Sequence, residues 1–369
     1  MENRKIRVAI THGDTNGIGY ELIFKTFAEP EMLELCTPII YGSPKVAAYH
    51  RNALGIQAGF TIISNAAEAK DDKLYLVSTF DEDVKVELGK GSDESEKAAL
   101  DALDRAMEDC RQGLVDVIVL GPADGKNIKS GNLDLPGHFG YVEKGLGDGK
   151  KGMRIMVSSQ IRVALVTDGM PLRDVSAAIT PDSLETSIRT LHNALKSDFR
   201  VSSPRIAVLA LNPQNGKNGT EEQEVIVPAI EKMAEEGINA FGPYNADTFF
   251  GNGSHYAFDA VLAMYHDQGI APVTALASDS VVNHISGLSV VVAAGDMNPH
   301  FEMAGSGKAD EESFRHAIYD AVDAFRNRTD YFAPLENPLP KLFHEKRDDS
   351  EKVRFAIPKK HENAIKERS

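Results

Sequence analysis

Residues 258–269 read FDAVLAMYHDQG and join a buried strand to a polar terminus. The apolar run 260–264 ends abruptly in Tyr265, His266, Asp267 and Gln268. In open α/β sheets, ligands bind outside the carboxyl ends of parallel strands, so His266 and Asp267 stand where a site is expected. The stretch therefore predicts a strand that delivers polar chemistry at its carboxyl end.

Similar apolar runs alternate with amphipathic helices along most of the chain. This alternation is typical of an α/β fold with a parallel sheet covered on both faces. Expected strands lie at 6–11, 37–41, 74–77, 115–120, 154–157, 163–167, 205–211, 260–265 and 289–293. Expected helices lie at 19–28, 44–53, 93–112, 181–196, 221–236 and 310–326. The charged segment 346–369 is expected to be a loosely docked tail.

Composition limits the range of functions. A chain of 369 residues predicts two domains or one two-lobed body. Its net charge of -15 argues against nucleic acid or an anionic membrane as a partner, because both repel an acidic surface. Cys36 and Cys110 lack metal or redox spacing and are expected to be ordinary buried thiols. Without an apolar signal core or a run of about 18 apolar residues, we expect a cytoplasmic protein.

Residues 11–21, THGDTNGIGYE, place glycines at the turn between the first strand and the first helix. Gly17 and Gly19 would allow close backbone approach to a ligand and expose helix N–H groups. The spacing G-x-x-x-G-x-G differs from the dinucleotide fingerprint G-x-G-x-x-G. A plain tight turn and a ligand loop both remain open.

Other segments that follow strands also carry polar groups. In 120–126, LGPADGK, Lys126 could neutralise a phosphate or carboxylate, and His138 could hydrogen-bond a substrate hydroxyl. The loop 211–222 is rich in Gly and Asn and leads into a helix. Asp247 could accept hydrogen bonds from a ligand or simply cap a short helix. Alternatively, Lys126 and His138 are ordinary surface residues without a functional role.

In their order, these segments resemble the 4-hydroxythreonine-4-phosphate dehydrogenase family from residue 5 to about residue 326. The resemblance rests on GDTNGIGYE, GPADGKNI, PGH, RVALVTDGMPLRD, RIAVLALNP, GPYNADTFF, AVLAMYHDQG and EMAGSGKAD. It implies a two-lobed α/β/α subunit similar to isocitrate and isopropylmalate dehydrogenases, and a homodimer with its site between the lobes near the partner subunit. NAD or NADP and a divalent metal are implied as cofactors. The implied lobes are 1–130 with 295–345, and 131–294, followed by the tail 346–369.

The chain departs from the family at the implied metal site. Where the family carries three histidines, only His266 remains, and the other two positions hold Gly169 and Gln214. A catalytic metal usually has about three protein ligands, and glycine offers none. Asp168 and Asp267 stand next to these positions, so a rearranged carboxylate site for magnesium or manganese stays an alternative.

The implied phosphate and cofactor positions also differ. Two family cations that bind substrate phosphate align with Thr274 and Val292, and a substrate-contacting Thr aligns with Phe139. Gly125 occupies the position of the loop lysine, which shifts to Lys126. In place of Asp-His-Gly-Thr-Ala the chain has DMNPH at 296–300, where proline removes a backbone donor.

The resemblance assigns a role to each remaining polar residue. Catalysis would involve His138, His266 and Asp267, and substrate binding His138, Asn283 and Lys126. Cofactor binding falls to Asp247, Asp296, Gly17 and Gly19, and the only metal ligand left is His266. Two hypotheses follow for this small-molecule site. One is an oxidoreductase with a changed site that acts on a different hydroxy acid, with or without a phosphate. The other is a non-catalytic paralogue that serves as a binding or regulatory subunit.

Overall fold

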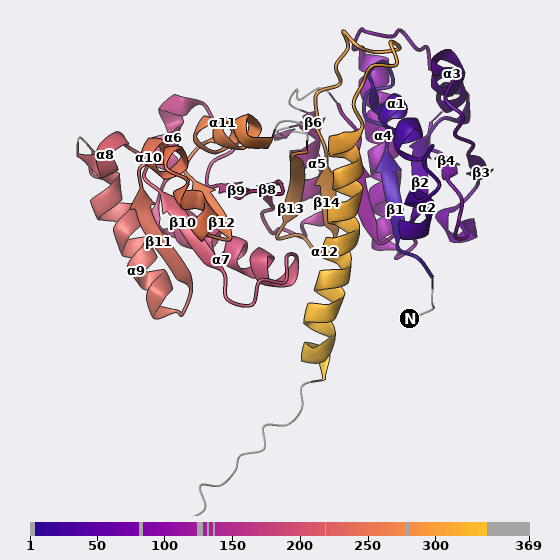
Figure 1. Ribbon diagram of the computed structural model, residues 1–369. Coiled ribbons are helices and arrows are strands. Elements are labelled where there is room, and N and C mark those ends of the chain that lie inside the picture. Colours follow the sequence, from indigo (N-terminus) through magenta and orange to yellow (C-terminus); the bar gives the residue numbers. More distant parts are fainter. Residues whose placement is uncertain are drawn as a thin grey trace, which may run out of the picture. The chain divides into compact units, whose positions relative to one another are not determined.

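The computed structural model describes residues 4–80, 84–123, 128–130, 133–135, 137–217, 219–277 and 280–337 (Figure 1). The chain divides into a unit Met1–Phe332, which contains every strand, and a unit Ala333–Ser369. The predicted tail 346–369 lies outside the described residues. Within the described residues, no helix is long and apolar enough to cross a membrane.

A sheet of 12 strands forms the centre of the first unit, in the order β11-β10-β12-β9-β8-β13-β14-β5-β1-β2-β4-β3. Its strands are β1 (Arg7–Thr11), β2 (Thr37–Gly42), β3 (Thr61–Ile63), β4 (Tyr75–Ser78), β5 (Val117–Leu120), β8 (Met153–Val157), β9 (Arg162–Leu165), β10 (Arg205–Leu209), β11 (Asn239–Tyr244), β12 (Ala260–Ala263), β13 (Val282–Ser286) and β14 (Val291–Ala294). A separate hairpin pairs β6 (Ile128–Ser130) with β7 (Leu133–Leu135).

Helices occupy most of the connections between the strands. They are α1 (Gly19–Thr26), α2 (Met32–Leu35), α3 (Pro44–Leu54), α4 (Asp93–Arg111), α5 (Gly137–Leu146), α6 (Leu172–Ala178), α7 (Pro181–Ser197), α8 (Pro213–Gly216), α9 (Val227–Glu235), α10 (Ala246–Gly251), α11 (His266–Ala277) and α12 (Glu312–Glu336). Short 3-10 turns lie at η1 (Ala66–Glu68) and η3 (Ser254–Ala257), and the π-helical turn η2 (Glu222–Ile226) leads into α9. The longer helices begin at good caps, as at α4, where Ser92 and Ser95 form a capping box.

The expectation of a purely parallel sheet was wrong at its centre. Strand β13 is antiparallel to both β14 and β8, and β8 is antiparallel to β9, while the other pairs are parallel. The connection from β8 to β9 explains this direction, since only 158–161 separate the two strands and a parallel crossover needs about a dozen residues. Two largely parallel halves therefore meet at a short antiparallel centre.

The register assigns residues to the two faces of this sheet. One face carries a cluster around Ile118, Val292 and Leu120 in one half, and a cluster around Val163 and Leu209 in the other. Helices α4 and α5 cover the first of these clusters, and α10 and α11 cover the second. The opposite face carries two further clusters, covered by α1, α3 and α12 in one half and by α7 and α9 in the other. The predicted α/β/α class is thus confirmed.

Most predicted elements were found with small shifts at their ends, the last helix was longer than predicted, and several elements were missed. The helix expected at 310–326 begins at Glu312 and extends to Glu336, and the strand expected at 260–265 stops at Ala263. Sequence reasoning did not predict α5 or α11, which contain Gly or Pro, nor the strands β11 and β13. Both cysteines are free thiols, with Cys36 buried and Cys110 half-buried, so full burial was wrong for Cys110.

Candidate functional site

Polar side chains interrupt the apolar face at the antiparallel centre of the sheet. Arg154 on β8 pairs in register with Ile285 on β13, which pairs with Val292 on β14. Opposite residues of an antiparallel pair project from the same face, so these three side chains form one row. Asn283 lies two residues from Ile285 and therefore shares that face. Its Nδ2 donates a hydrogen bond to the Gly295 carbonyl at 2.8 Å.

His138 and Phe139 lie in the first turn of α5, which covers the same face. His138 is 5% exposed, and among the described residues its Nδ1 has no hydrogen-bond partner. Burial lowers the pKa of His138 to about 4, so the imidazole is uncharged at neutral pH. An uncharged imidazole with an open nitrogen can exchange a hydrogen bond with a substrate hydroxyl.

In the HDQG sequence that follows β12, His266 and Asp267 are exposed, whereas Gln268 makes structural hydrogen bonds. His266 and Asp267 are both exposed, and His266 Nδ1 lies 2.9 Å from Asp267 Oδ1. Gln268 accepts a hydrogen bond from the Met264 backbone at 2.7 Å and donates one to the Ala210 carbonyl at 2.6 Å. It thereby ties the end of β12 to the end of β10. His266 and Asp267 are the two members left free for chemistry.

The three positions of the implied metal site follow three adjacent parallel strands. Gly169 follows β9, His266 follows β12 and Gln214 follows β10. Among the described residues, no group of three or more His, Cys, Asp or Glu side chains could hold a metal ion. The topology thus brings the positions to one edge, but the donors present do not fit the three-histidine metal of the family.

Asp168 beside Gly169 is engaged by a cation. Its Oδ1 accepts a hydrogen bond from Arg154 Nη2 at 2.8 Å. The Arg154 guanidinium also lies 5.5 Å from the centre of the Phe139 ring. Sequence reasoning did not single out Arg154, although a charge inside the apolar run MRIMV of β8 was a usable signal.

The changed positions next to His138 lie within one apolar cluster. Val292 is fully buried, and Phe139 and Met297 pack partly buried against the cluster that contains it. These are the positions where the family resemblance implied a cation, a hydroxyl and a histidine. The side chains at these three positions are therefore apolar in this chain.

The glycines of the first loop are enclosed by protein. A Cβ on Gly17 would lie 2.7 Å from the Pro299 carbonyl oxygen, and one on Gly19 would lie 1.8 Å from that of His12. Asp14 in this loop accepts hydrogen bonds from Ser95 Oγ and from its own loop. Close packing alone explains both glycines, and their cofactor role stays a prediction.

The loop after β14 closes over this first loop. The Ile18 N–H donates to the Pro299 carbonyl at 3.1 Å. His300 donates from Nε2 to Asp296 at 2.8 Å and from Nδ1 to Glu302 at 2.9 Å. Partial burial lowers the pKa of His300, but the two carboxylates outweigh it and raise the pKa overall. The carboxylate of Asp296 is thus engaged by its own loop.

Asp247 lies at the other end of the sheet from these glycines. It is exposed on α10 and accepts a hydrogen bond from the Thr248 N–H at 2.7 Å. It follows β11, which seven strands separate from β1, or about 38 Å at a usual strand spacing. Over such a distance, a dinucleotide that contacts both places would have to include residues of a partner subunit, and the cofactor role of Asp247 stays a prediction.

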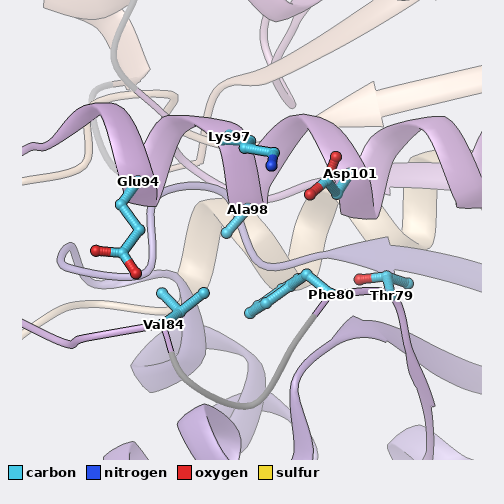
Figure 2. A pocket seen from close by; sticks show the side chains of 7 residues that line it. All are labelled: Thr79, Phe80, Val84, Glu94, Lys97, Ala98 and Asp101. Atoms are coloured by element: carbon cyan, nitrogen blue, oxygen red, sulfur yellow. The ribbon is translucent and has the colours of Figure 1, made fainter.

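Two cavities lie away from the central strands. One of about 440 Å³ lies between α4 and the segment after β4, and Figure 2 shows Glu94, Lys97 and Asp101 along the helix facing Phe80. The other, of about 190 Å³, is lined by Tyr244, Asn245, Thr248, Phe249, Asn252 and Ser254 beside Asp247. Neither includes a predicted catalytic residue, and the larger one has more acidic than basic groups.

Lys126, which was predicted to bind substrate, lies outside the described residues.

The fold and the central face together define an α/β protein whose sheet carries a row of polar groups at its antiparallel centre. Comparison with known proteins identifies the family. The family model described as pyridoxal phosphate biosynthetic protein PdxA matches residues 34–321, and the chain belongs to this family.

Individual relatives agree with this assignment. A 4-hydroxythreonine-4-phosphate dehydrogenase from Bacteroides thetaiotaomicron is 51% identical over 96% of this chain and 98% of its own length. One from Geobacter metallireducens is 34% identical over 88% of this chain and 97% of its own. The crystal structure of a 4-hydroxythreonine-4-phosphate dehydrogenase from Klebsiella pneumoniae has a TM-score of 0.75 at 25% identity, covering 88% of this chain and 99% of that one.

Proposed function

We propose that this chain is an NAD(P)-dependent oxidoreductase of the 4-hydroxythreonine-4-phosphate dehydrogenase type with a changed metal and phosphate site. It would act on a different, non-phosphorylated hydroxy acid, or on the family substrate with lower activity. The observation that supports this best is the apolar cluster at Val292, Phe139 and Met297 beside the retained His138 and Asn283. The site keeps groups for a hydroxyl but has replaced groups for a phosphate.

The energetic consequence concerns the phosphate. Each charge-assisted hydrogen bond contributes about 1.5 to 3 kcal/mol. Losing two cations, at Val292 and Thr274, would weaken binding of a phosphate dianion by about 3 to 6 kcal/mol, or roughly 10² to 10⁴-fold. A substrate without a phosphate avoids this loss, so the change favours non-phosphorylated hydroxy acids.

Oxidation of a hydroxyl releases a hydride and a proton. NAD(P) would supply the hydride acceptor when bound. The proton needs a base on this chain, and the exposed His266 beside Asp267 is better suited than His138, whose lowered pKa makes it a weak base. A general base contributes roughly 10² to 10⁴-fold. His138 is then left to orient the hydroxyl by a hydrogen bond.

A second candidate function is a catalytically inactive paralogue that acts as a binding or regulatory subunit. Two observations favour it. Within the described residues no metal-binding group is present, and Pro299 fills the space over Gly17 where a cofactor was expected. An inactive paralogue would keep the fold of the family without its catalytic activity.

Metal analysis of the purified protein, combined with calorimetric titration of NAD and NADP, separates the two. Binding of a dinucleotide without stoichiometric metal supports the changed oxidoreductase. Stoichiometric metal in the wild type would contradict the inactive paralogue and would favour the rearranged carboxylate site. If neither metal nor dinucleotide binds, the oxidoreductase is excluded and the binding subunit is favoured.

A matched variant tests whether the metal site can be restored. Gly169→His with Gln214→His should gain zinc binding at neutral pH. A Cβ at Gly169 meets nothing within 4 Å, and Gln214 already has a φ of 57°. Since Gly169 has a φ of 66°, its replacement should cost about 1 kcal/mol of strain. A folded variant that binds no zinc would show that the implied ligand positions are misassigned.

We also propose a cytoplasmic homodimer with the two lobes 1–130 with 295–345, and 131–294. The separation of Asp247 from Gly17 supports a dimer, because a partner subunit could bring the two regions together. Sedimentation analysis tests it directly. A monomer at micromolar concentration would contradict it.

A further inference from the structure

We propose that Arg154 binds the carboxylate of the substrate and so sets its specificity. The inference rests on the proposed function for the kind of substrate, but the anion site itself can be tested without turnover. Arg154 lies on the face that carries Asn283, in the same register row as Val292. The chain thus has a cation two strands away from the position where the family resemblance implied one.

The hydrogen-bonding state of Arg154 indicates a missing acceptor. The side chain is 18% exposed, and within the described chain only Asp168 accepts from its guanidinium. Its Nε is buried, and none of the described residues is a hydrogen-bond partner for it. A guanidinium has five N–H donors, and leaving donors unmet at this burial costs free energy. An anion that approaches the remaining Nη donors would satisfy part of this demand.

The surroundings of the guanidinium fix its position. The Phe139 ring lies 5.5 Å below it, at a distance suited to a cation–π contact, and Asp168 holds one Nη group. A guanidinium whose position is already fixed loses little conformational entropy when it binds a planar anion through two hydrogen bonds. His138, the neighbour of Phe139 on α5, is available for a hydroxyl.

The charge balance favours a carboxylate over a phosphate. Asp168 neutralises much of the charge of Arg154, so the pair offers little net attraction to set against the desolvation cost of an anion, and that cost is larger for a phosphate dianion than for a carboxylate. A single guanidinium also matches a carboxylate in shape, with two parallel hydrogen bonds. The substrate class is therefore a hydroxy acid with a single carboxylate.

The test uses thermal unfolding of the whole protein with increasing 3-hydroxybutyrate or inorganic phosphate, at constant ionic strength set by chloride. We expect 3-hydroxybutyrate to raise the unfolding midpoint at lower concentration than phosphate. In Arg154→Met the apparent affinity should fall at least tenfold. Arg173→Met removes an exposed arginine on α6 and should bind like the wild type.

A second variant keeps the test valid if Arg154→Met folds poorly. Asp168→Asn removes the competing carboxylate and should raise the apparent affinity several-fold. Equal affinity in Arg154→Met and the wild type, no binding to the wild type, or a preference for phosphate would overturn the inference. Arg154-dependent binding without oxidation of any hydroxy acid by NAD(P) would support it while excluding the proposed oxidoreductase.

Discussion

The buried ion network at His284 should make the stability of this protein depend on pH above neutrality. His284 lies on β13, fully buried on the face opposite Asn283. Its Nδ1 donates to Asp320 of α12 at 2.7 Å, and its Nε2 donates to Asp198, just after α7, at 2.9 Å. Arg328 of α12 also donates to both oxygens of Asp198, at 2.7 and 2.8 Å. An imidazole that donates from both nitrogens is an imidazolium.

The magnitude follows from the pKa of His284. Burial lowers this pKa, but the carboxylates of Asp320 and Asp198 outweigh it and raise the pKa to about 9. In the unfolded chain the pKa is about 6.5. Because the folded pKa is raised, the stabilisation is fully present below pH 6.5 and is lost as the pH rises through 9. The difference amounts to about 3 kcal/mol.

Urea unfolding followed by circular dichroism between pH 6 and 9.5 measures this loss. Asp320→Asn removes the larger attraction, so it should lower the pKa of His284 and move the loss to lower pH. His284→Gln should remove the dependence in this window and cost about 3 to 5 kcal/mol at pH 6, because two buried carboxylates lose their shared partner. His316→Gln, which removes a partly exposed histidine of α12 outside this network, is the control. If all of these proteins have the same pH dependence, the reasoning is wrong.

Two further predictions concern the site. Gln268→Ala should lower the free energy of unfolding by about 2 kcal/mol, because it leaves backbone groups next to β12 and β10 unpaired. Asp267→Ala, at an exposed position, should change it by less than about 0.5 kcal/mol. Urea unfolding measures both values. Val292→Arg should destabilise the protein by several kcal/mol because it places a charge in an apolar cluster. Thr274→Lys, at an exposed position of α11, should be tolerated, and thermal unfolding compares the two variants. Equal effects within either pair would contradict the assigned burial.

The strands that the sequence predicted are those with continuous apolar runs. β1, β5 and β12 were recognised as strands because helices cover both faces of the sheet, so their central positions are all apolar. β13 was missed because VNHIS places Asn283 on one face and His284 on the other. Tertiary partners far away in the sequence, such as Asp198 and Asp320, make this strand possible, and no local pattern reports them.

The same limit applied to the site. His266 and His138 could be selected because each follows a recognisable motif, and the strand order then placed their surroundings on one face. Arg154 could not be assigned a role from the sequence, because the residues in its row of the sheet, Ile285 and Val292, are more than 100 residues away. Helix α11 was missed because Gly269 and Pro272 disfavour a helix locally, while burial of Val273 against the sheet stabilises it.

The alternation along β13 also explains how the site could change without loss of the fold. Asn283 faces the central row with Arg154, while His284 faces the ion network that ties β13 to α7 and α12. Because neighbouring residues of a strand project from opposite faces, substitutions at the site face leave the network intact. The position of Val292 on that same site face, without a polar partner, fits this separation. On the proposed function, stability and substrate specificity would therefore rest on opposite faces of the same central strand.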